Sequence, residues 1–427
     1  MTAPVGVASW QVCAACGDVL TELDPRTTCD CGGLLEIRHR PPALQGPALR
    51  ELFEKRWGLH DPIDASGVWR YREIVLPTAA DPVTHPEGGT PLLSRPAIAE
   101  WAGVPDLRLK HEGHNPTGSF KDRGMTVGVT QARRIGARAV ACASTGNTSA
   151  ALAAYAAQAG IPALVFVPAG QVALGKLAQS LAYGAKTLLV RGDFDDCLRL
   201  VQQASDSLGV YLLNSINPFR LEGQKTIVLE ALQQLGWEVP DWIVLPAGNL
   251  GNTAAFGKAL GEARALGLIS RLPRLAAVQA AGAAPFARSF AEGFAARHRV
   301  KAETVATAIK IGDPASYERA VRAIRETGGL VLSVTDAEIL EAKAVIDAAG
   351  VGCEPASAAS VAGTRKLAAA GTIRPGERVV AVLTGHVLKD PGVLIEYHQK
   401  TEPPPPRANR PIEIDATLAE VERVLRK

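Results

Sequence analysis

Residues 138–167 have the sequence RAVACASTGNTSAALAAYAAQAGIPALVFV, which places an Ala-rich segment between two continuous apolar runs, 138–143 and 162–167. Gly160 and Pro162 separate the Ala-rich segment from the second run. Continuous apolar runs are typical of strands buried on both faces, and a helix between two such strands forms a βαβ unit. The stretch therefore predicts two parallel strands joined by a helix.

The same alternation of apolar runs and helical segments continues over most of the chain from about residue 104 onward. Intervening segments of roughly 10–15 residues have the length of crossover helices. The further apolar runs are KTLLV (186–190), VYLLN (210–214), WIVLP (242–246), LAAVQA (275–280) and RVVAVLT (378–384). We therefore predict an α/β fold with mainly parallel β-sheet.

The two ends of the chain lack this alternation. Residues 1–40 are rich in Cys, Gly and Thr without a helical period, which predicts a small Cys-rich knuckle of zinc-ribbon type. Near the other end, EPPPPRANRP is a stiff Pro-rich linker that precedes a short helical tail. We expect three parts: the module 1–40, a core 41–401, and the linker with its tail, 402–427.

The composition favours a cytoplasmic globular protein. A net charge of +3 over 427 residues, with 5% aromatic residues, gives no basic stripe of the kind that binds nucleic acid. The apolar stretch 149–169 is broken by Gly and Pro, so we expect no membrane span, and the N-terminus shows no secretory signal. Seven Cys, an odd number, fit a reducing compartment better than a disulfide framework.

Polar, Gly-rich segments follow three of the predicted strands, at the edge where α/β sheets bind ligands. The first is ASTGNTSA, 143–150, which gathers five polar side chains around Gly146. N-capping of the following helix is the alternative interpretation, but one cap requires only one hydroxyl. The polar residues of this segment are Ser144, Thr145, Asn147, Thr148 and Ser149.

The second segment is PAGNLGNTAAFGKAL, 246–260, and it predicts a phosphate-binding turn. Gly248 and Gly251 free the backbone to turn, and a helix that begins near Asn252 offers unpaired N–H groups at its positive end. It is not a Walker A motif, because its spacing is too long and Ala259 stands where Ser or Thr is required. A plain Gly-rich turn is the alternative.

A lysine, Lys121, adds a reactive amine to the groups that these segments provide. Lys121 lies in NPTGSFKDRG, 115–124, between a turn-forming run and an expected helix, and the third polar segment, 383–390, places Thr384 at a strand end. A partly desolvated lysine can lose its proton near neutral pH and attack a carbonyl to form a Schiff base. A phosphorylated aldehyde that acts as an electron sink is pyridoxal phosphate. The alternative for Lys121 alone is a solvated surface lysine.

At these residues the chain resembles the threonine synthases, members of the tryptophan synthase β-subunit-like group of pyridoxal phosphate enzymes. The resemblance runs from GGTPLL (88–93) to GHVLKD (385–390), and it implies two open twisted mainly parallel sheets flanked by helices, with a smaller subdomain at roughly 125–230. The segments that carry it are NPTGSFKDRGMT, ASTGNTSA, VALGKLAQSLAYGA, NSINPFRLEGQKT, ATAIKIGDPAS, CEPASAAS and LTGHVLKD.

The resemblance implies roles for the cofactor-binding positions. Lys121 would carry the cofactor as a Schiff base beside Phe120, Asn147 would bond the ring oxygen, and Thr384 the pyridine nitrogen. A hydroxyl cannot protonate that nitrogen as a carboxylate would, so the ring is a milder electron sink. The phosphate would lie in the loop Gly248, Asn249, Leu250, Gly251 and Asn252.

The implied substrate is O-phosphohomoserine, which water would convert into L-threonine and phosphate, with Lys121 as the general base at Cα and then at Cβ. Arg220 would bind the substrate phosphate as a planar fork, with a structural salt bridge as its alternative role, and Lys176 could join it. The resemblance also implies a homodimer. The other expected substrate-binding residues are Ser144, Thr145, Thr148, Asn214 and Ser215.

Four cysteines near the N-terminus form a candidate metal site. Cys13-x-x-Cys16 is followed after twelve residues by Cys29-x-Cys31, and four thiolates would make a closed, structural zinc site. The second pair has a tighter spacing than C-x-x-C. A metal-free knuckle with reduced thiols is therefore the alternative.

Other functions remain open at this point. Related enzymes with the same cofactor dehydrate serine or threonine, or replace the phosphate of phosphoserine by sulfite as a cysteate synthase does. Ser215 and Arg220 argue against a simple dehydratase but not against a phosphoserine-using enzyme. A non-catalytic protein that keeps the fold is a further alternative, and it would lack a reactive lysine.

Overall fold

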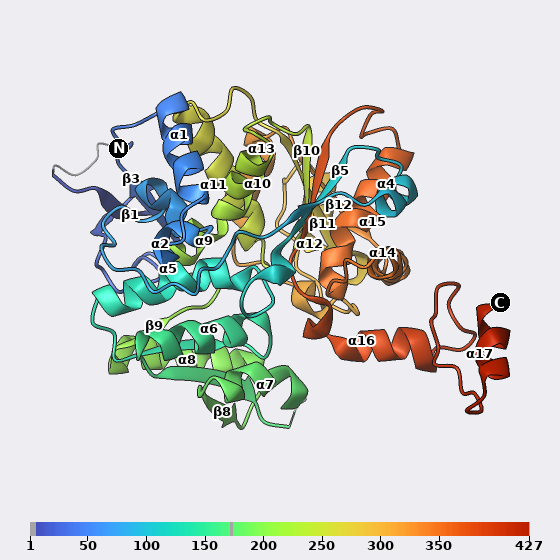
Figure 1. Cartoon of the computed structure of the whole chain (residues 1–427). Helices are drawn as coiled ribbons and strands as arrows, with labels where there is room; N and C mark the ends of the chain where they lie inside the picture. The colour runs from blue at the N-terminus through green and yellow to red at the C-terminus, as the bar shows by residue number, and fades with distance from the viewer. Residues whose placement is uncertain (1–5, 171–173, 427) are drawn as a thin grey trace.

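Two open β-sheets, one of six strands and one of four, form the body of the molecule in the computed structural model (Figure 1). The structure describes residues 6–170 and 174–426, except the side chains of 174–176. A third, three-stranded sheet lies near the N-terminus. The parallel strands of both large sheets bring their carboxyl ends, and the loops that follow them, toward one region of the molecule.

The six-stranded sheet is buried on both faces. Its strand order is β12-β11-β10-β13-β5-β4, and only the pairing of β4 with β5 is antiparallel among its described strand pairs. Along β10, Ile243 and Leu245 face one hydrophobic core and Trp242 and Val244 the other, which explains the continuous apolar run. The strands are β4 (Leu92–Leu93), β5 (Leu107–His111), β10 (Trp242–Pro246), β11 (Arg274–Ala280), β12 (Leu330–Val334) and β13 (Val379–Leu383).

Helices cover both faces of this sheet. The first core is built with α1 (Gly46–Trp57), α3 (Arg72–Val75), α9 (Pro218–Gln224), α10 (Thr226–Gln234), α11 (Gly251–Ala265), α12 (Pro285–Ala291) and α13 (Tyr317–Glu326). The second core is built with α4 (Pro96–Ala102), α14 (Asp336–Ala348) and α15 (Pro355–Ala369). The short helix α2 (Pro62–Ala65) connects α1 to this region.

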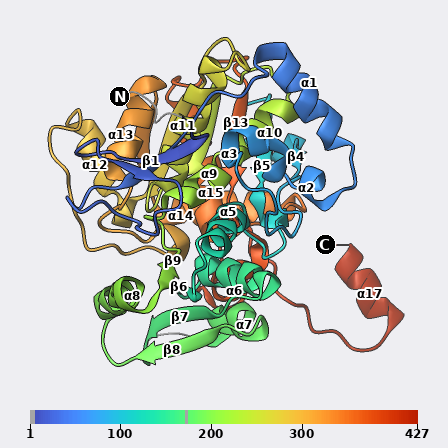
Figure 2. The same ribbon diagram turned by 90° about the vertical axis from the view of Figure 1, so that its left-hand side faces the viewer.

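The four-stranded sheet contains the predicted βαβ unit. Strands β6 (Ala139–Ala143) and β7 (Ala163–Pro168) pair in parallel and are joined by α6 (Asn147–Ala159), which confirms the prediction for 138–167. Figure 2 shows this sheet and its helices beneath the larger sheet. The order is β8-β7-β6-β9, with β8 (Lys186–Val190), β9 (Val210–Leu212), and the flanking helices α5 (Lys121–Arg134), α7 (Leu174–Ala182) and α8 (Phe194–Leu208).

The N-terminal module is a small antiparallel sheet that carries all four clustered cysteines. Strand β1 (Ser9–Cys13) lies between β2 (Val19–Thr21) and β3 (Leu35–His39). Figure 1 shows the module beside α9 and α11. The predicted knuckle thus forms its own sheet against the helical layer of the core.

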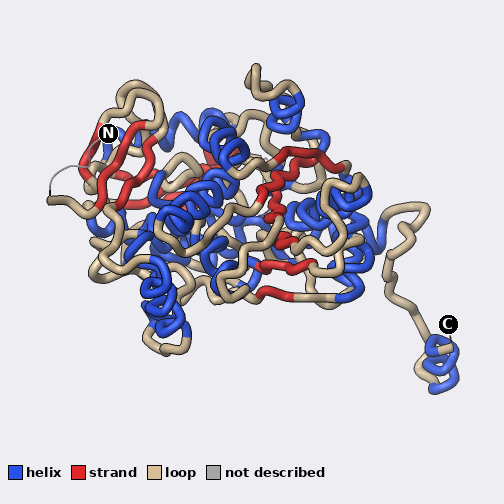
Figure 3. Tube along the Cα trace, turned by 90° about the horizontal axis from the view of Figure 1, so that it is seen from above, coloured by secondary structure: helices blue, strands red, loops and turns tan. Residues whose placement is uncertain are grey.

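The C-terminal segment leaves the body of the molecule (Figure 3). Helix α16 (Pro391–Ile395) continues into a π-helical turn, Glu396–Lys400, and α17 (Leu418–Leu425) stands apart at the end. Among the described helices, none is long and apolar enough to cross a membrane. The expected boundaries at residues 40 and 401 stay predictions.

Candidate active site

A cavity of about 1280 Å³ lies at the carboxyl ends of the parallel strands and is lined by the three predicted polar segments and the Lys121 loop. Among the predicted cofactor and substrate residues whose side chains the structure describes, Arg220 alone is not part of the cavity wall. The predicted residues that line the cavity are Phe120, Lys121, Ser144, Thr145, Asn147, Thr148, Asn214, Ser215, Gly248, Asn249, Leu250, Gly251, Asn252 and Thr384.

Backbone hydrogen bonds join the Lys121 loop to the segment at the end of β13. The amide of Phe120 donates to the carbonyl of Thr384 at 3.0 Å, and the amide of His386 donates to the carbonyl of Gly118 at 2.8 Å. These bonds fix the two segments edge to edge. Residues that lie more than 250 positions apart in the chain therefore meet as neighbours in one wall of the cavity.

Lys121 is the first residue of α5 and is held there by its neighbour Asp122. The Asp122 carboxylate accepts bonds from the Thr117 amide at 2.7 Å and from the Thr117 hydroxyl at 2.5 Å, which closes the turn before the helix. Burial lowers the pKa of Lys121 to about 7, nearby Arg220 also lowers it, and Glu354 opposes the shift. Near neutral pH much of this lysine is therefore an uncharged amine, the form that attacks carbonyls.

The lysine amine lies against an aromatic ring. Lys121 Nζ is 4.4 Å from the centroid of the Phe120 ring. Phe120 therefore forms part of the apolar surface that desolvates the amine. The Lys121 side chain is half-buried in the cavity wall beside Phe120, which argues against the interpretation of Lys121 as a solvated surface lysine.

Glu354 lies between the two residues expected at the cofactor ring. Asn147 Nδ2 donates to Glu354 Oε2 at 2.9 Å, and the Thr384 hydroxyl donates to Glu354 Oε1 at 2.9 Å. Burial raises the pKa of the Glu354 carboxyl, and the bonds from Asn147 and Thr384 oppose this shift. A Cβ on Gly385 would come within 2.5 Å of Glu354 Cδ, so a larger residue there would displace the Glu354 carboxyl.

Sequence reasoning gave no role to Glu354. The residue stands in CEPASAAS, 353–360, where it is the one carboxylate among small residues and immediately precedes the Pro that begins α15. A lone carboxylate directly before a helix was the sequence signal that could have identified Glu354 as a site residue. What no pattern shows is that Asn147, from the smaller sheet, meets a carboxylate of the larger one.

The loop 248–252 has the geometry of a phosphate cradle. Leu250 adopts φ 64°, in the left-handed region that non-glycine residues rarely occupy, and α11 begins directly after it. Leu250 is the N-cap of α11, and its aliphatic side chain makes no hydrogen bond to the amides of the first turn. A Cβ on Gly248 would lie 2.9 Å from Ile309 Cα, so the backbone approaches closely there. Open amides at the positive end of a helix fit the phosphate of pyridoxal phosphate.

The segment 143–150 does not serve as a helix cap. Gly146 is the N-cap of α6, and no side chain caps this helix. Ser149 instead donates to the Gly146 carbonyl at 2.9 Å, within the segment. Ser144 and Thr148 line the cavity, so the N-capping interpretation is wrong and these hydroxyls are available to a ligand.

Arg220 is buried behind this wall without a carboxylate partner among the described residues. Its Nη1 donates to the Leu213 carbonyl at 3.0 Å, whereas Nε and Nη2 have no hydrogen-bond partner in the described structure. Burial lowers the pKa of Arg220 to about 10. The alternative of a structural salt bridge is therefore wrong, and the guanidinium is a buried cation that still lacks an anion. The side chain of Lys176 lies outside the described residues.

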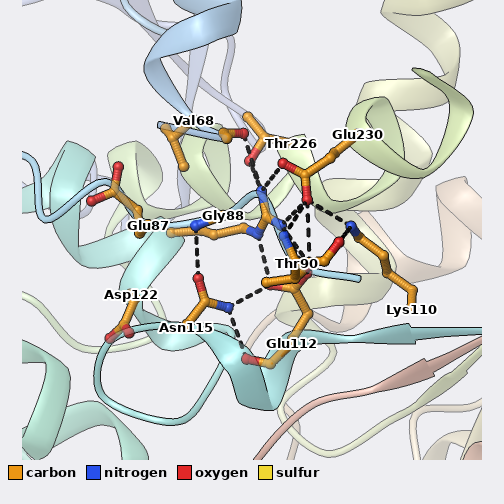
Figure 4. Close-up of polar contacts among 12 residues, drawn as sticks. Val68, Glu87, Gly88, Thr90, Lys110, Glu112, Asn115, Asp122, Thr226 and Glu230 are labelled. Atoms are coloured by element: carbon orange, nitrogen blue, oxygen red, sulfur yellow. Dashed lines mark hydrogen bonds and ion pairs between the residues drawn. The ribbon is translucent and has the colours of Figure 1, made fainter. Parts of the chain in front are cut away.

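An ionic cluster of Lys110, Glu112, Arg123 and Glu230 lies beside Asn115, at the start of the Lys121 loop (Figure 4). Arg123 bonds Glu112 at 2.6 Å and Glu230 at 2.7 Å, and Lys110 bonds the same Glu230 oxygen at 2.6 Å. All four side chains are fully buried. The Asn115 side chain, at the start of the lysine loop, donates to Glu112 at 2.8 Å, so the cluster anchors that loop.

The four N-terminal cysteines converge on one point. Their sulfur atoms all lie within 4.8 Å of one another, with Cys13 and Cys31 at 3.5 Å, Cys16 and Cys31 at 3.4 Å, and Cys16 and Cys29 at 3.7 Å. Zinc–sulfur bonds of about 2.3 Å place tetrahedral ligands about 3.8 Å apart. The cluster could therefore hold a metal ion, and the tight Cys29-x-Cys31 spacing does not prevent convergence.

Asp313 lies at the rim of the cavity and is neutralised there. Its carboxylate pairs with Arg297 at 2.5 Å and with Arg299 at 3.0 Å. Its charge is therefore directed to these arginines and not to the buried Arg220.

Comparisons with known proteins agree with this geometry. A family model described as pyridoxal-phosphate dependent enzyme matches residues 83–385. A threonine synthase of Methanosarcina acetivorans is 50% identical over 387 residues, covering 90% of this chain and 93% of that protein. A threonine synthase of Methanocaldococcus jannaschii is 44% identical over 427 residues, covering 98% and 99%.

Solved structures share the fold at lower identity. The threonine synthase of Escherichia coli superposes with a TM-score of 0.64 at 21% identity, over 93% of this chain and 94% of that one. Maize serine racemase gives a TM-score of 0.63 at 22% identity, over 78% and 95%. The predicted fold class and the predicted pyridoxal phosphate are thereby confirmed.

Proposed function

The chain belongs to the threonine synthases, a family of pyridoxal-phosphate-dependent enzymes, and from this premise we propose that it converts O-phosphohomoserine and water into L-threonine and phosphate. One observation carries the choice of substrate. A lysine amine with a pKa of about 7 and an unpaired buried guanidinium, Lys121 and Arg220, lie close enough for the second to depress the pKa of the first. The amine of Lys121 can attack a carbonyl, and the guanidinium of Arg220 can bind a phosphate.

The residues of the site divide the binding of the cofactor among them. Pyridoxal phosphate, when bound, supplies a carbonyl for an amine and a ring that withdraws electrons from it. Lys121 would hold it at the carbonyl carbon, and the open amides at the start of α11 would bind its phosphate. Asn147 and Thr384 would bond the ring oxygen and ring nitrogen, with Glu354 keeping both side chains in line between the two sheets.

Lys121 would also move the protons. The free lysine amine would take a proton from the substrate Cα and then from Cβ, and phosphate would leave from Cγ. A base that both accepts and returns protons works best when its pKa is near the working pH, and burial sets the pKa of Lys121 at about 7. The lysine would return one proton to Cγ, water would add its hydroxyl at Cβ, and a proton returned to Cα would complete threonine, while the second proton of water leaves with phosphate.

The phosphate of the substrate would occupy the side of the cavity near α9. The side-chain Nδ2 of Asn249 donates to the Ser215 hydroxyl at 3.1 Å, and Asn214 Oδ1 accepts from the backbone amide of Ala143 at 3.0 Å, which orients Ser215 and Asn214. Hydroxyls of Ser144, Thr145 and Thr148 face the same cavity. A phosphate bound there would give Arg220 the anion that it lacks among the described residues.

A steady-state comparison of substrates tests this function. Holoenzyme is incubated with O-phosphohomoserine, with O-phosphoserine plus sulfite, and with L-serine or L-threonine, and threonine, cysteate and 2-oxo acids are measured. We expect threonine and phosphate in equal amounts from the first substrate and little turnover of the others. Absence of threonine from O-phosphohomoserine would overturn the proposal, and cysteate formation would support the phosphoserine-using alternative.

We also propose that the enzyme acts as a homodimer in the cytoplasm and that the cysteine cluster holds a structural zinc ion. Four thiolates within 4.8 Å fit zinc, and a closed set of four ligands leaves no position for substrate. Light scattering of the purified holoenzyme tests the dimer, and metal analysis after gel filtration tests the zinc. Limited proteolysis near residues 40 and 402 tests the proposed boundaries of the parts 1–40, 41–401 and 402–427.

A further inference from the structure

The N-terminal module is tied to α9, the helix that carries Arg220, by a buried hydrogen bond. His39 Nε2 of β3 lies 2.8 Å from Glu222 Oε2 of α9, and neither side chain is more than 6% exposed. Lys258 of α11 joins the two elements a second time, because it bonds both Glu222 and the carbonyl of Ile37, the latter at 2.6 Å. Strand β3 and helix α9 are thus held to each other inside the protein.

Charge balance around Glu222 does not depend on His39. Lys225 bonds Glu222 at 2.6 Å and Glu262 at 2.7 Å, and Lys258 bonds Glu222 as well, so two lysines already match two carboxylates. Burial lowers the pKa of His39, so its ring is neutral at physiological pH. The His39 ring therefore orients the Glu222 carboxylate through a hydrogen bond and does not neutralise its charge.

Helix α9 connects this contact to the active site. Successive residues of a helix turn by about 100°, so Glu222 and Arg220 project from nearly opposite sides of α9. A Cβ on Gly223 would lie 1.7 Å from the carbonyl oxygen of Arg123, which means that α9 touches the backbone of α5 directly. Because α5 begins at Lys121, α9 packs directly against the helix that carries the lysine.

On its other side, His39 is held by the cysteine-bearing strand. The Ser9 hydroxyl lies 2.8 Å from His39 Nδ1, and β1 pairs with β3 from Ser9 opposite His39 to Cys13 opposite Leu35. A continuous ladder therefore runs from the cysteine cluster to His39. Both ring nitrogens of this histidine are used, one toward β1 and one toward α9.

We propose that the N-terminal module sets the affinity of the active site for the phosphate of its substrate, with His39 and Glu222 as positioning residues that hold α9 and Arg220 in register. The inference rests on the proposed function in that Arg220 is taken as the phosphate-binding residue. The chemistry at Lys121 does not pass through this contact. Loosening it should therefore weaken phosphate binding while leaving turnover at saturation nearly intact.

The test uses full-length holoenzyme with His39→Leu and His39→Gln. Leucine fills the space without a hydrogen bond, whereas the glutamine amide can still donate to Glu222. We expect His39→Leu to raise KM for O-phosphohomoserine and the Kd for inorganic phosphate by about tenfold, with kcat within about twofold. We expect His39→Gln to recover most of both losses. Unchanged visible absorbance of the bound cofactor would show that the Lys121 end is intact.

Two further variants complete the design. Arg38→Leu lies on the same strand, where Arg38 pairs at 3.0 Å with Glu36 and is half exposed, so it should leave KM and Kd unchanged. Lys258→Gln cuts the second link and should reproduce the phosphate effect if His39→Leu fails to fold. Equal losses in KM and kcat, or a Kd for phosphate that no variant changes, would overturn the inference.

Failure of the proposed function would appear differently. A wild-type enzyme that makes no threonine from O-phosphohomoserine would contradict that function. The Kd for inorganic phosphate, measured by calorimetry, would still test the inference about His39. A weaker Kd in His39→Leu, recovered in His39→Gln, supports it without any turnover.

Discussion

Arg123 and Arg220 are both fully buried on helices that touch, yet their surroundings are opposite. Arg123 on α5 bonds two carboxylates, Glu112 and Glu230, which raise its pKa although burial opposes them. Arg220 on α9 bonds one carbonyl, has two guanidinium nitrogens without partners in the described structure, and has its pKa lowered to about 10 by burial. Within the described structure, the Arg123 guanidinium is fully paired, whereas the Arg220 guanidinium has hydrogen-bond donors left over.

The difference separates a structural charge from a binding charge. Burial of an ion costs several kcal/mol unless a partner offsets it, so an unpaired arginine is costly to the folded protein. Such a residue is consistent with a ligand that brings the missing anion. Arg123 by contrast holds together segments that surround Lys121, and the four charges of its cluster sum to zero. Loss of Arg123 should therefore lower the stability of the protein, whereas loss of Arg220 should weaken substrate binding.

The largest effect is expected at Lys121. Lys121→Ala should lower the rate of threonine formation by about 10⁴-fold, because it removes the proton-transfer group, and should abolish the visible band of the purified protein. Lys121→Arg should be equally inactive, since a guanidinium stays protonated. Substantial turnover in either variant, measured by steady-state assay, would contradict the role of Lys121.

Arg123→Met should mainly affect stability. It leaves Glu112 and Glu230 as uncompensated buried carboxylates with one lysine between them, which should lower the free energy of unfolding by about 3–5 kcal/mol. Urea unfolding followed by circular dichroism measures this. Arg220→Met serves as the matched control and should cost less than about 1 kcal/mol, because it removes a charge without stranding a partner. Equal losses in both variants would break the comparison.

Arg220→Met should mainly affect substrate binding. Loss of a charged hydrogen-bond donor to phosphate costs about 2–3 kcal/mol, so KM for O-phosphohomoserine should rise by about 100-fold while kcat changes much less. Arg123→Lys, which keeps the buried charge, is the comparison variant and should leave KM near the wild-type value. An unchanged KM in Arg220→Met would show that the unpaired guanidinium does not bind the substrate.

The smallest effect concerns pH. The neutral amine of Lys121 reacts with carbonyls, so the rate at which apoprotein takes up pyridoxal phosphate should rise as pH increases through about 7 and then level off. Arg220 lowers the pKa of Lys121, so Arg220→Met should move the midpoint to higher pH. Stopped-flow absorbance across pH 5–9 measures the midpoint in the wild type and in Arg220→Met. A midpoint that does not move would show that burial alone lowers the pKa of Lys121.

Some strands could be predicted from the sequence and others could not. The runs 242–246 and 186–190 form strands with the predicted ends. Strand β5 (Leu107–His111) was not among the predicted strands, because Arg108 and Lys110 interrupt its apolar pattern. Lys110 is nevertheless fully buried, since Glu230, 120 positions later in the chain, neutralises it. A local pattern contains no information about such a partner.

The candidate site divides in the same way. Lys121, Asn147, Thr384 and the loop 248–252 follow strands or turns, so local chemistry marked them as candidates, and the family resemblance supplied their roles. Glu354 was missed because its importance lies in contacts to Asn147 and Thr384, which come from two different sheets. Arg220 was selected as a phosphate ligand, but its burial behind the cavity wall was not foreseen.

The amino-acid sequence contained the alternation of apolar runs and helices, the Gly-rich polar turns after strands, and a lysine at a loop-to-helix junction, because each depends on residues adjacent in the chain. Desolvation of Lys121, the partners of Arg123 and the lack of partners around Arg220 arise only when distant segments pack. The electrostatic free energy of a charge depends on every group within several ångströms of it, and only folding brings those groups together.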